Sequence, residues 1–321
     1  MKKIIYISYF LFISCETTLD IKLPESDPKL VINSYMIADQ FWNGRNQFAL
    51  VSNSIQGIGN IEDYIYTDSI PVINNATAII NEMDNSEYSI NQYQLLFDNT
   101  CYCYTNQEFT PRENKKYELN VSVEGYPPIR AVDIVPSKAE YTISNFELFT
   151  ELDTFSSGNL CQFNISLKDL PNIDNYYILK IYIENTTTNS RKRCIYEVQD
   201  PSFLIPINRY NASNTYYEGV NGYFTDDLFD GQERNMFVKV EKPEGVYNQF
   251  YIEIITLSDN LYNFNLTRKE QKRDSDNYLF NSEAIFIDSN IEGGYGIFGA
   301  RAKSQKVYIP TFFPTNGWIE Y

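Results

Sequence analysis

Short segments in which apolar and polar residues alternate recur along this chain, and they constrain its fold more than any other feature. In Tyr117–Val123 every second residue is apolar, and Glu, Asn and Ser stand between them. A period of two places one side chain in a core and the next in water, as on a half-buried strand. Turn dipeptides such as Asn43-Gly44 separate the segments. The pattern predicts a mainly all-β fold.

The segments form two groups, and 321 residues are enough to bury two cores. Residues 28–136 are predicted to form an immunoglobulin-like antiparallel β-sandwich, because short strands follow one another at turns. Residues 137–306 are predicted to form a second β-rich domain with one short helix, which follows the N-cap residue Ser258. Residues 307–321, with two prolines and Asn-Gly, are predicted to be an irregular tail. The expected strands are 29–36, 47–52, 76–81, 117–123, 129–135, 163–167, 176–183, 236–240 and 249–257.

The N-terminus has the pattern of an export signal. Two lysines precede Ile4–Ile13, an apolar run of about ten residues that is too short to cross a bilayer. Ser14 then precedes Cys15, as in bacterial lipoprotein signals, in which the cysteine is diacylated after cleavage. We predict residues 1–14 to be a signal peptide, Cys15 to be lipidated, and residues 15–27 to be a polar tether. The alternative is a secreted protein with a cysteine there by chance.

Charge and composition exclude several kinds of site. The net charge of −16 repels nucleic acid and anionic lipid surfaces, so neither is expected as a partner. The chain contains no histidine, so Ser-His-Asp, Cys-His and HExxH sites cannot be built. We therefore expect no cofactor and no enzymatic activity. A carboxylate-based hydrolase remains an alternative, and it would need an Asp/Glu pair facing across a cleft.

Four cysteines follow Cys15, and export would place them where disulfides form. Cys161 and Cys194 flank an expected strand pair, so we favour a bridge between them. Cys101 and Cys103 would share one face of a regular strand, too far apart to bond unless the chain turns there. Connectivity cannot be read from spacing, so both pairings stay open.

Tyrosines suggest a ligand-contact region. Tyr210, Tyr216, Tyr217 and Tyr223 lie in a stretch rich in Asn and Gly, which predicts a loop. Rigid amphipathic rings and adaptable amides suit recognition of a peptide or a glycan. Drift of composition towards Asn, Ile, Tyr and Lys explains the same residues without a ligand.

Two further motifs have a functional and a structural interpretation. Asp226, Asp227 and Asp230 precede Gly231 and could offer oxygens to Ca²⁺, but the EF-hand spacing is absent and an acidic turn is favoured. The run from Gly293 to Gly299 contains GxGxxG, but no βαβ pattern surrounds it. We interpret these glycines as permitting tight turns or a bulge in the last strand.

Four segments carry a resemblance to a known family: Leu19–Met36, Pro71–Ile80 with the strands after it, Asp227–Gly231, and Asn290–Ala300. The chain resembles a Bacteroidota lipoprotein family of unknown function whose genes often lie beside TonB-dependent receptors. The resemblance covers roughly Cys15 to Lys303. It implies a two-domain β protein on the outer membrane, facing the cell surface, with a TonB-dependent receptor as partner. It implies no catalytic residues.

These observations lead to one preferred function and two alternatives. We expect a lipid-anchored outer-membrane protein that acts as a non-enzymatic substrate-binding or accessory subunit of a TonB-dependent nutrient transporter. The first alternative is a structural or adhesive surface module. The second is the carboxylate-based hydrolase.

Overall fold

Most of the chain between residues 28 and 310 is described by a computed structural model. Within the described residues the chain forms strands and one helix, which confirms the all-β class. The immunoglobulin-like topology stays a prediction. No helix in the described part is long and apolar enough to span a membrane. The described residues are 28–38, 46–54, 72–84, 88–150, 159–198, 200–203, 216–217, 222–241, 249–275 and 286–310.

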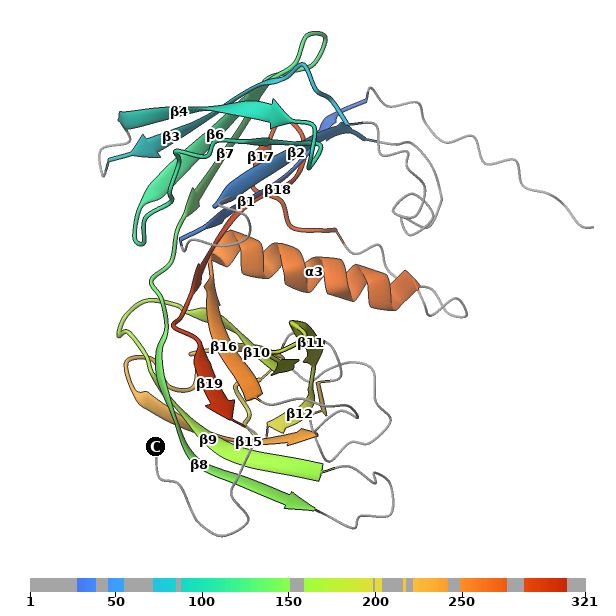
Figure 1. The fold of residues 1–321 in the computed structure, drawn as a ribbon. Helices are drawn as coiled ribbons and strands as arrows, with labels where there is room; N and C mark the ends of the chain where they lie inside the picture. Colours follow the sequence, from blue (N-terminus) through green and yellow to red (C-terminus); the bar gives the residue numbers. More distant parts are fainter. Residues whose placement is uncertain are drawn as a thin grey trace, which may run out of the picture.

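The first unit is a β-sandwich whose layers belong to one long sheet (Figure 1). Its strands are β1 (Leu30–Ile37), β2 (Gln47–Asn53), β3 (Thr77–Met83), β4 (Ser89–Asp98), β5 (Cys103–Thr105), β6 (Lys116–Ser122), β7 (Ile129–Ile134), β17 (Ile291–Glu292) and β18 (Tyr295–Lys303). They follow the order β18-β1-β2-β5-β4-β3-β6-β7-β17. Alternate residues of β1, β2 and β18 meet those of β3, β6 and β7 in one buried core, which includes Ile32, Ile80, Leu119 and Phe298.

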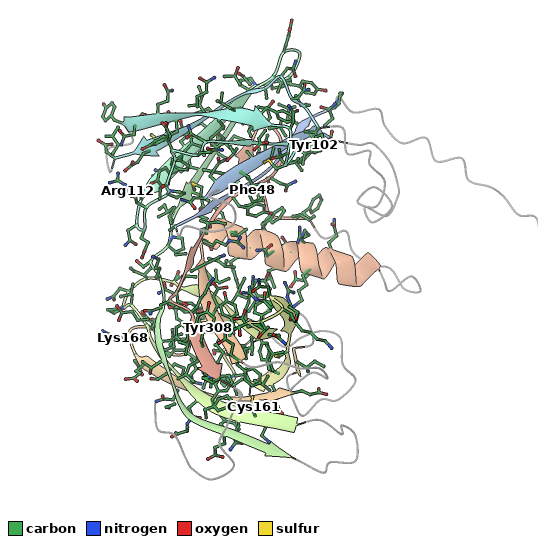
Figure 2. The ribbon with its side chains drawn as sticks, viewed as in Figure 1. Phe48, Tyr102, Arg112, Cys161, Lys168 and Tyr308 are labelled. Atoms are coloured by element: carbon green, nitrogen blue, oxygen red, sulfur yellow. A yellow bond between two sulfur atoms is a disulfide. The ribbon has the colours of Figure 1, made fainter. Side chains whose placement is uncertain are left out.

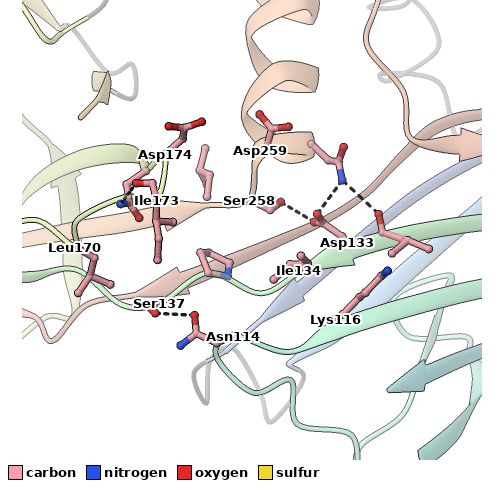
Figure 3. A pocket seen from close by; sticks show the side chains of 15 residues that line it. Asn114, Lys116, Asp133, Ile134, Ser137, Leu170, Ile173, Asp174, Ser258 and Asp259 are labelled. Carbon is pink, nitrogen blue, oxygen red and sulfur yellow. Dashed lines mark hydrogen bonds between the residues drawn. The ribbon is translucent and has the colours of Figure 1, made fainter. Parts of the chain in front are cut away.

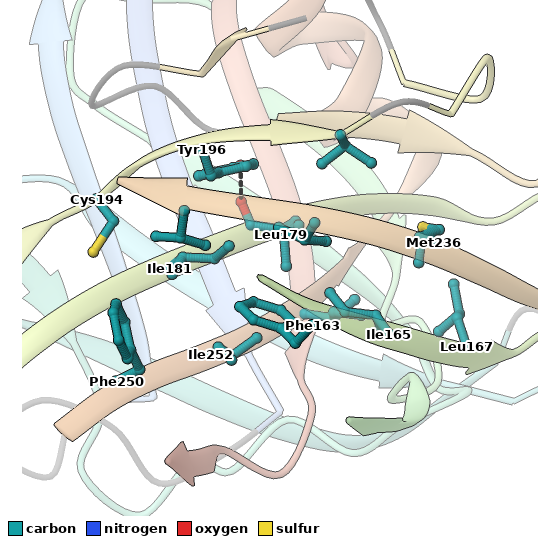
Figure 4. Packing of buried hydrophobic residues seen from close by; sticks show 14 of the residues in the cluster. Phe163, Ile165, Leu167, Leu179, Ile181, Cys194, Tyr196, Met236, Phe250 and Ile252 are labelled. Carbon is teal, nitrogen blue, oxygen red and sulfur yellow. Dashed lines mark hydrogen bonds between the residues drawn. The ribbon is translucent and has the colours of Figure 1, made fainter. Parts of the chain in front are cut away.

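The second unit packs a five-stranded sheet against the other end of the long sheet. Its strands are β8 (Glu140–Thr150), β9 (Asn159–Lys168), β10 (Tyr176–Asn185), β11 (Ser190–Arg193), β12 (Ile195–Val198), β13 (Tyr216–Tyr217), β14 (Gly222–Thr225), β15 (Glu233–Glu241), β16 (Gln249–Leu257) and β19 (Val307–Pro310). The order β13-β12-β15-β9-β8 makes the smaller sheet. Phe163, Leu179 and Ile252 pack between the sheets (Figure 4), and burial of each contributes about 1.5–3 kcal/mol.

Strand β18 joins the two units, which corrects the predicted boundary. Its residues pair in parallel with β1 from Val31↔Tyr295 to Ile37↔Arg301, and its end pairs with β16. Strand β17 pairs with β7. The sequence-based division placed residues 137–306 wholly in the second domain, but β17 and β18 complete the first sandwich. Pairing between distant segments has no local sequence signal, so the strand pattern alone missed it.

The C-terminal tail also differs from its prediction in its first residues. Val307–Pro310 forms β19, which pairs antiparallel with β16 over Gln249–Ile252. Among the described strands β19 pairs only with β16, so it is an edge strand, on which the missing backbone donor of Pro310 is tolerated. Residues 311–321 lie outside the described part of the chain.

The helix α3 (Asp259–Ser275) confirms the predicted one and covers the outer face of the long sheet beside β16 and β18. Leu261, Tyr262 and Phe264 pack on the sheet residues Ile255 and Ile297. Ser258 caps the helix, since its Oγ accepts a hydrogen bond of 3.4 Å from the backbone nitrogen of Leu261. This small apolar face positions the N-terminal end of α3 at the junction of the two units.

Candidate functional site

A pocket of about 340 Å³ lies where the two units meet, at the N-terminal end of α3 (Figure 3). Strands β6 and β7 form its wall from the first unit. The loop between β9 and β10 and the β16–α3 junction form its wall from the second. Pockets between structural units are common ligand sites, because each unit supplies its own polar and apolar groups. The pocket is therefore the candidate site.

Asp133 on β7 is the most buried charged group of the pocket, with 4% of its surface exposed. Ser258 Oγ donates a 2.6 Å hydrogen bond to Asp133 Oδ2, and Asn260 Nδ2 donates one of 2.9 Å to Oδ1. Burial raises the pKa of the Asp133 carboxyl to about 7, against the opposing effect of these donors. Ser258 Oγ also accepts a hydrogen bond of 3.1 Å from the backbone nitrogen of Ala300 on β18. Asp133 thus ties β7 to α3 and, through Ser258, to β18.

The rest of the pocket presents both apolar and charged groups. Ile134 and Ile173 are about half exposed, at 53% and 55%, so apolar surface remains available to a ligand. Lys116, Asp174 and Asp259 bring charges of both signs to the lining. Both oxygens of Asp133 already accept hydrogen bonds from the protein. This arrangement suits binding of a small polar ligand better than proton transfer to one.

An acidic cluster forms at the predicted turn, but one of its three residues differs from the prediction. Ligand atoms of Asp169, Asp226 and Asp230 lie within 4.8 Å of one another. Asp227 is not in this group, and its carboxylate instead accepts a hydrogen bond from Thr225 Oγ1. Asp169 directly follows β9 and pairs with the turn only in the folded chain, so its distance in sequence concealed it. These three carboxylates are the described residues that could hold a metal ion.

The hydrogen bonds of this cluster indicate a structural clamp. The backbone nitrogen and Nδ2 of Asn175 both donate to Asp226, at 2.9 and 3.1 Å. The hydroxyl of Tyr177 donates to Asp169 at 2.6 Å, and the backbone nitrogen of Gly231 donates at 2.8 Å. Protein donors thus occupy these carboxylates and fasten the turn after β14 to the loop after β9. This arrangement favours the acidic-turn interpretation.

The predicted tyrosines do not form a single loop. Tyr216 and Tyr217 make up β13 and pair with β12 in the five-stranded sheet. Tyr223 lies on β14, which pairs with β10 of the long sheet, and its ring lies 6.3 Å from that of Tyr262. Tyr210 lies outside the described residues. Only Tyr223 therefore has a described side-chain environment, and α3 forms part of it.

The favoured disulfide pairing is wrong. Cys101 and Cys103 form the disulfide, and neither Cys161 nor Cys194 is in one. Tyr102 has a positive φ of 50°, so the chain turns between the bonded cysteines and brings their Cα atoms to 5.2 Å (Figure 2).

Cys161 and Cys194 lie in the core of the second unit. Strand β15 separates β9, which carries Cys161, from β12, which begins just after Cys194. Two strand spacings of about 4.8 Å are too long for a disulfide. Burial raises the pKa of the Cys194 thiol to about 12, so the thiol stays protonated. The predicted lipidation residue, Cys15, lies outside the described residues.

The chain matches a known protein family over most of its length. The family described as a domain of unknown function, DUF4249, matches residues 16–307. This chain belongs to the DUF4249 family. The match includes both units and the pocket between them, so the DUF4249 domain spans the whole described fold except its last three residues. No curated protein matches the chain.

One of the solved structures similar to this DUF4249 chain is the Mu homology domain of Fcho1 from Danio rerio, with a bound Eps15 peptide. It shares 6% identity at a TM-score of 0.20, with 88% of this chain and 95% of that chain covered.

Proposed function

We propose that this DUF4249 protein is lipid-anchored in the outer membrane, faces the cell surface, and serves as a non-enzymatic substrate-binding or accessory subunit of a TonB-dependent nutrient transporter. The observation that carries the proposal is the predicted export segment, residues 1–14, directly before Cys15. Two acyl chains on that cysteine would hold the folded part at the membrane. The resemblance to lipoproteins encoded beside TonB-dependent receptors supplies the partner.

The pocket between the units supports a binding role. It combines apolar groups with charges of both signs, as ligand pockets commonly do. The chain lacks histidine, the commonest general acid and base, and the buried Asp133 is held by protein donors. We propose a peptide or a glycan as ligand, since either offers the polar and apolar surface that this lining complements.

Affinity isolation from the native outer membrane tests the partnership. A C-terminal tag on the full chain allows isolation after solubilisation in mild detergent, and mass spectrometry identifies proteins that are recovered with it. We expect a TonB-dependent receptor to be recovered with the wild type. The matched control is Cys15→Ser, which should lose both a metabolically incorporated fatty-acid label and membrane association.

Each result has a defined meaning. Recovery of the tagged protein alone, in a preparation where known transporter complexes stay intact, would refute the partnership. Absence of the fatty-acid label from the wild type would refute the anchor.

A further inference from the structure

Basic residues that do not line the pocket gather on the outer face of the long sheet. Lys180 on β10 lies opposite Glu253 on β16, and Lys303 on β18 lies opposite Ile255. Ile255 packs under α3, so these side chains share the face of the sheet that the helix partly covers. Arg301 belongs to the same face of β18, two residues before Lys303.

The helix brings two more basic residues to this face. Lys269 Nζ lies 5.7 Å from the ring centroid of Tyr223. Arg268 lies over Phe264 at 5.6 Å, and both Arg268 and Arg301 act electrostatically on Tyr35. Tyr35 and Tyr223 are therefore shared between α3 and the sheet. We call Lys180, Arg301, Lys303, Arg268 and Lys269 the cationic cluster.

Within the cationic cluster, Lys180 and Arg301 are under-neutralised among the described residues. Glu253 is the acidic residue whose charge acts on both Lys180 and Arg301. Neither of these basic residues forms an ion pair with another residue that the structure describes. In a chain with a net charge of −16, this face is an exception. Positive charges that are close together and half-buried repel one another, so this arrangement lowers the stability of the folded chain.

Two buried polar atoms on this face lack hydrogen-bond partners within the described part of the chain. They are Oε1 of Glu253, whose side chain is 4% exposed, and Nε of Arg301. Buried polar groups are normally hydrogen-bonded, because an unmet donor or acceptor is costly. The charge of Glu253 acts on Arg301, so one unmet donor and one unmet acceptor lie within electrostatic reach of each other. Together they match a ligand that offers both kinds of group. Burial also lowers the pKa of Lys180 to about 8, and repulsion from Arg301 adds to the shift.

We propose that the cationic cluster binds a soluble ligand that carries at least two anionic oxygen groups, carboxylate or phosphate, and a hydroxyl beside them. Arg301 and Lys180 contact the anionic groups, and Glu253 accepts the hydrogen bond of the hydroxyl. Tyr35 and Tyr223 flank the ligand. None of the residues of this site lines the pocket, and the proposal stands whether or not the protein partners a transporter.

Isothermal titration calorimetry on the full mature chain, made soluble by Cys15→Ser, tests the site with three probes at low salt and neutral pH. Citrate has three carboxylates and a hydroxyl, tricarballylate has the same carboxylates without the hydroxyl, and pyrophosphate supplies phosphate groups. We expect binding of citrate and weaker binding of tricarballylate. Binding of pyrophosphate instead would assign the anionic groups to phosphate. If none of the three probes binds at millimolar concentration, the proposal is wrong.

Variants then locate the binding. Arg301→Gln and Lys180→Gln should each weaken binding by about tenfold or more, since each removes a charge-assisted contact. Lys168→Gln is the matched control, because it removes the same charge from a side chain on β9 that is 74% exposed (Figure 2). An equal loss in the control would mean that general charge attraction, not a site, explains the binding.

Stability without ligand separates a binding role from a structural one. If the cationic cluster exists for a ligand, Lys180→Gln should leave the melting temperature unchanged or raised, because it relieves repulsion. If Lys180 and Arg301 instead neutralise acids of the protein itself, both variants should melt lower and the proposal is overturned. Should Arg301→Gln fail to fold, Lys180→Gln and Lys269→Gln on the helix decide the result.

Discussion

At the scale of single residues, Gly296 shows how one missing side chain allows two strands to pair. Its φ is +108°, and a Cβ at this position would lie 1.9 Å from the backbone oxygen of Ile32 on β1. No other residue can adopt this backbone and approach so closely. The glycine-rich run thus serves the parallel pairing of β18 with β1. Its role is structural, as predicted, but at Gly296 that role is a close approach of two strands and not a turn or a bulge.

Gly296→Ala should therefore lower the free energy of unfolding by about 2–4 kcal/mol, from steric overlap added to backbone strain. Gly125→Ala is the matched control, since Gly125 also has a positive φ, +85°, but a Cβ there would meet nothing within 4 Å. It should cost only about 1 kcal/mol. Urea unfolding followed by circular dichroism measures both values. Equal losses would mean that contact with Ile32 is unimportant.

At the scale of elements, α3 depends both on a local sequence pattern and on a contact with a distant part of the chain. Ser258 and the apolar spacing of Leu261 and Phe264 are local, and they predicted the helix. The donor role of Ser258 towards Asp133 comes from another unit of the fold and has no signal in the sequence around either residue. Ser258 therefore has two roles: it caps α3 and it joins the two units.

The buried Asp133 carboxyl should make stability depend on pH. Its pKa is raised to about 7 in the folded chain, whereas the unfolded chain releases the proton above pH about 4. The folded state holds the extra proton between these values, so this contribution to stability falls as the pH rises from about 4 to about 7. Asp133→Asn carries no such proton. As the pH rises from 4 to 8, the free energy of unfolding of the wild type should therefore fall by on the order of 3–4 kcal/mol relative to that of Asp133→Asn.

Urea midpoints at several pH values give this difference. Lys116, Asp174 and Asp259 line the same pocket, so a charge-matched control is needed. Asp174→Asn removes one acidic group from an exposed position there. A constant difference between wild type and Asp133→Asn at every pH would contradict the assignment to Asp133.

At the scale of the whole molecule, the two units cannot be separated along the sequence. The core of the first sandwich contains Ile291, Phe298 and Ala300 from β17 and β18, close to the C-terminal end of the described chain. Strand β18 also pairs with β16 of the second unit. The fold therefore closes only when the early strands β1 and β2 and the late strands β17 and β18 are all present.

A chain of residues 28–136 alone should consequently fail to fold cooperatively, because it lacks the strand that pairs with β1 and supplies Phe298 and Ala300 to the core. We expect a broad thermal transition and strong binding of the dye ANS, which detects exposed apolar surface. Residues 28–310 serve as the control and should melt in a cooperative transition. A sharp transition for residues 28–136 would show that β17 and β18 are dispensable.

Sequence alone recovered strands in which apolar residues alternate with polar ones, and also the densely apolar β16, but it missed a strand that is mostly polar. Alternation predicted β6 and β9, since each has one buried and one wetter face. Strand β4 is largely exposed and rich in polar residues, so no alternation marks it. The pocket could not be predicted either, because four separate segments of the chain build it.

What the sequence by itself determined is local: the all-β class, the helix after Ser258 and, as a prediction, the export segment of residues 1–14 before Cys15. Each depends on neighbouring residues, through periodicity, capping or a short apolar run. The tertiary structure decided that Cys101 bonds Cys103, that Asp169 joins the acidic cluster, and that β18 completes the first sandwich. The physical reason is that such contacts depend on how strands pair and pack, which brings together residues that no local pattern relates.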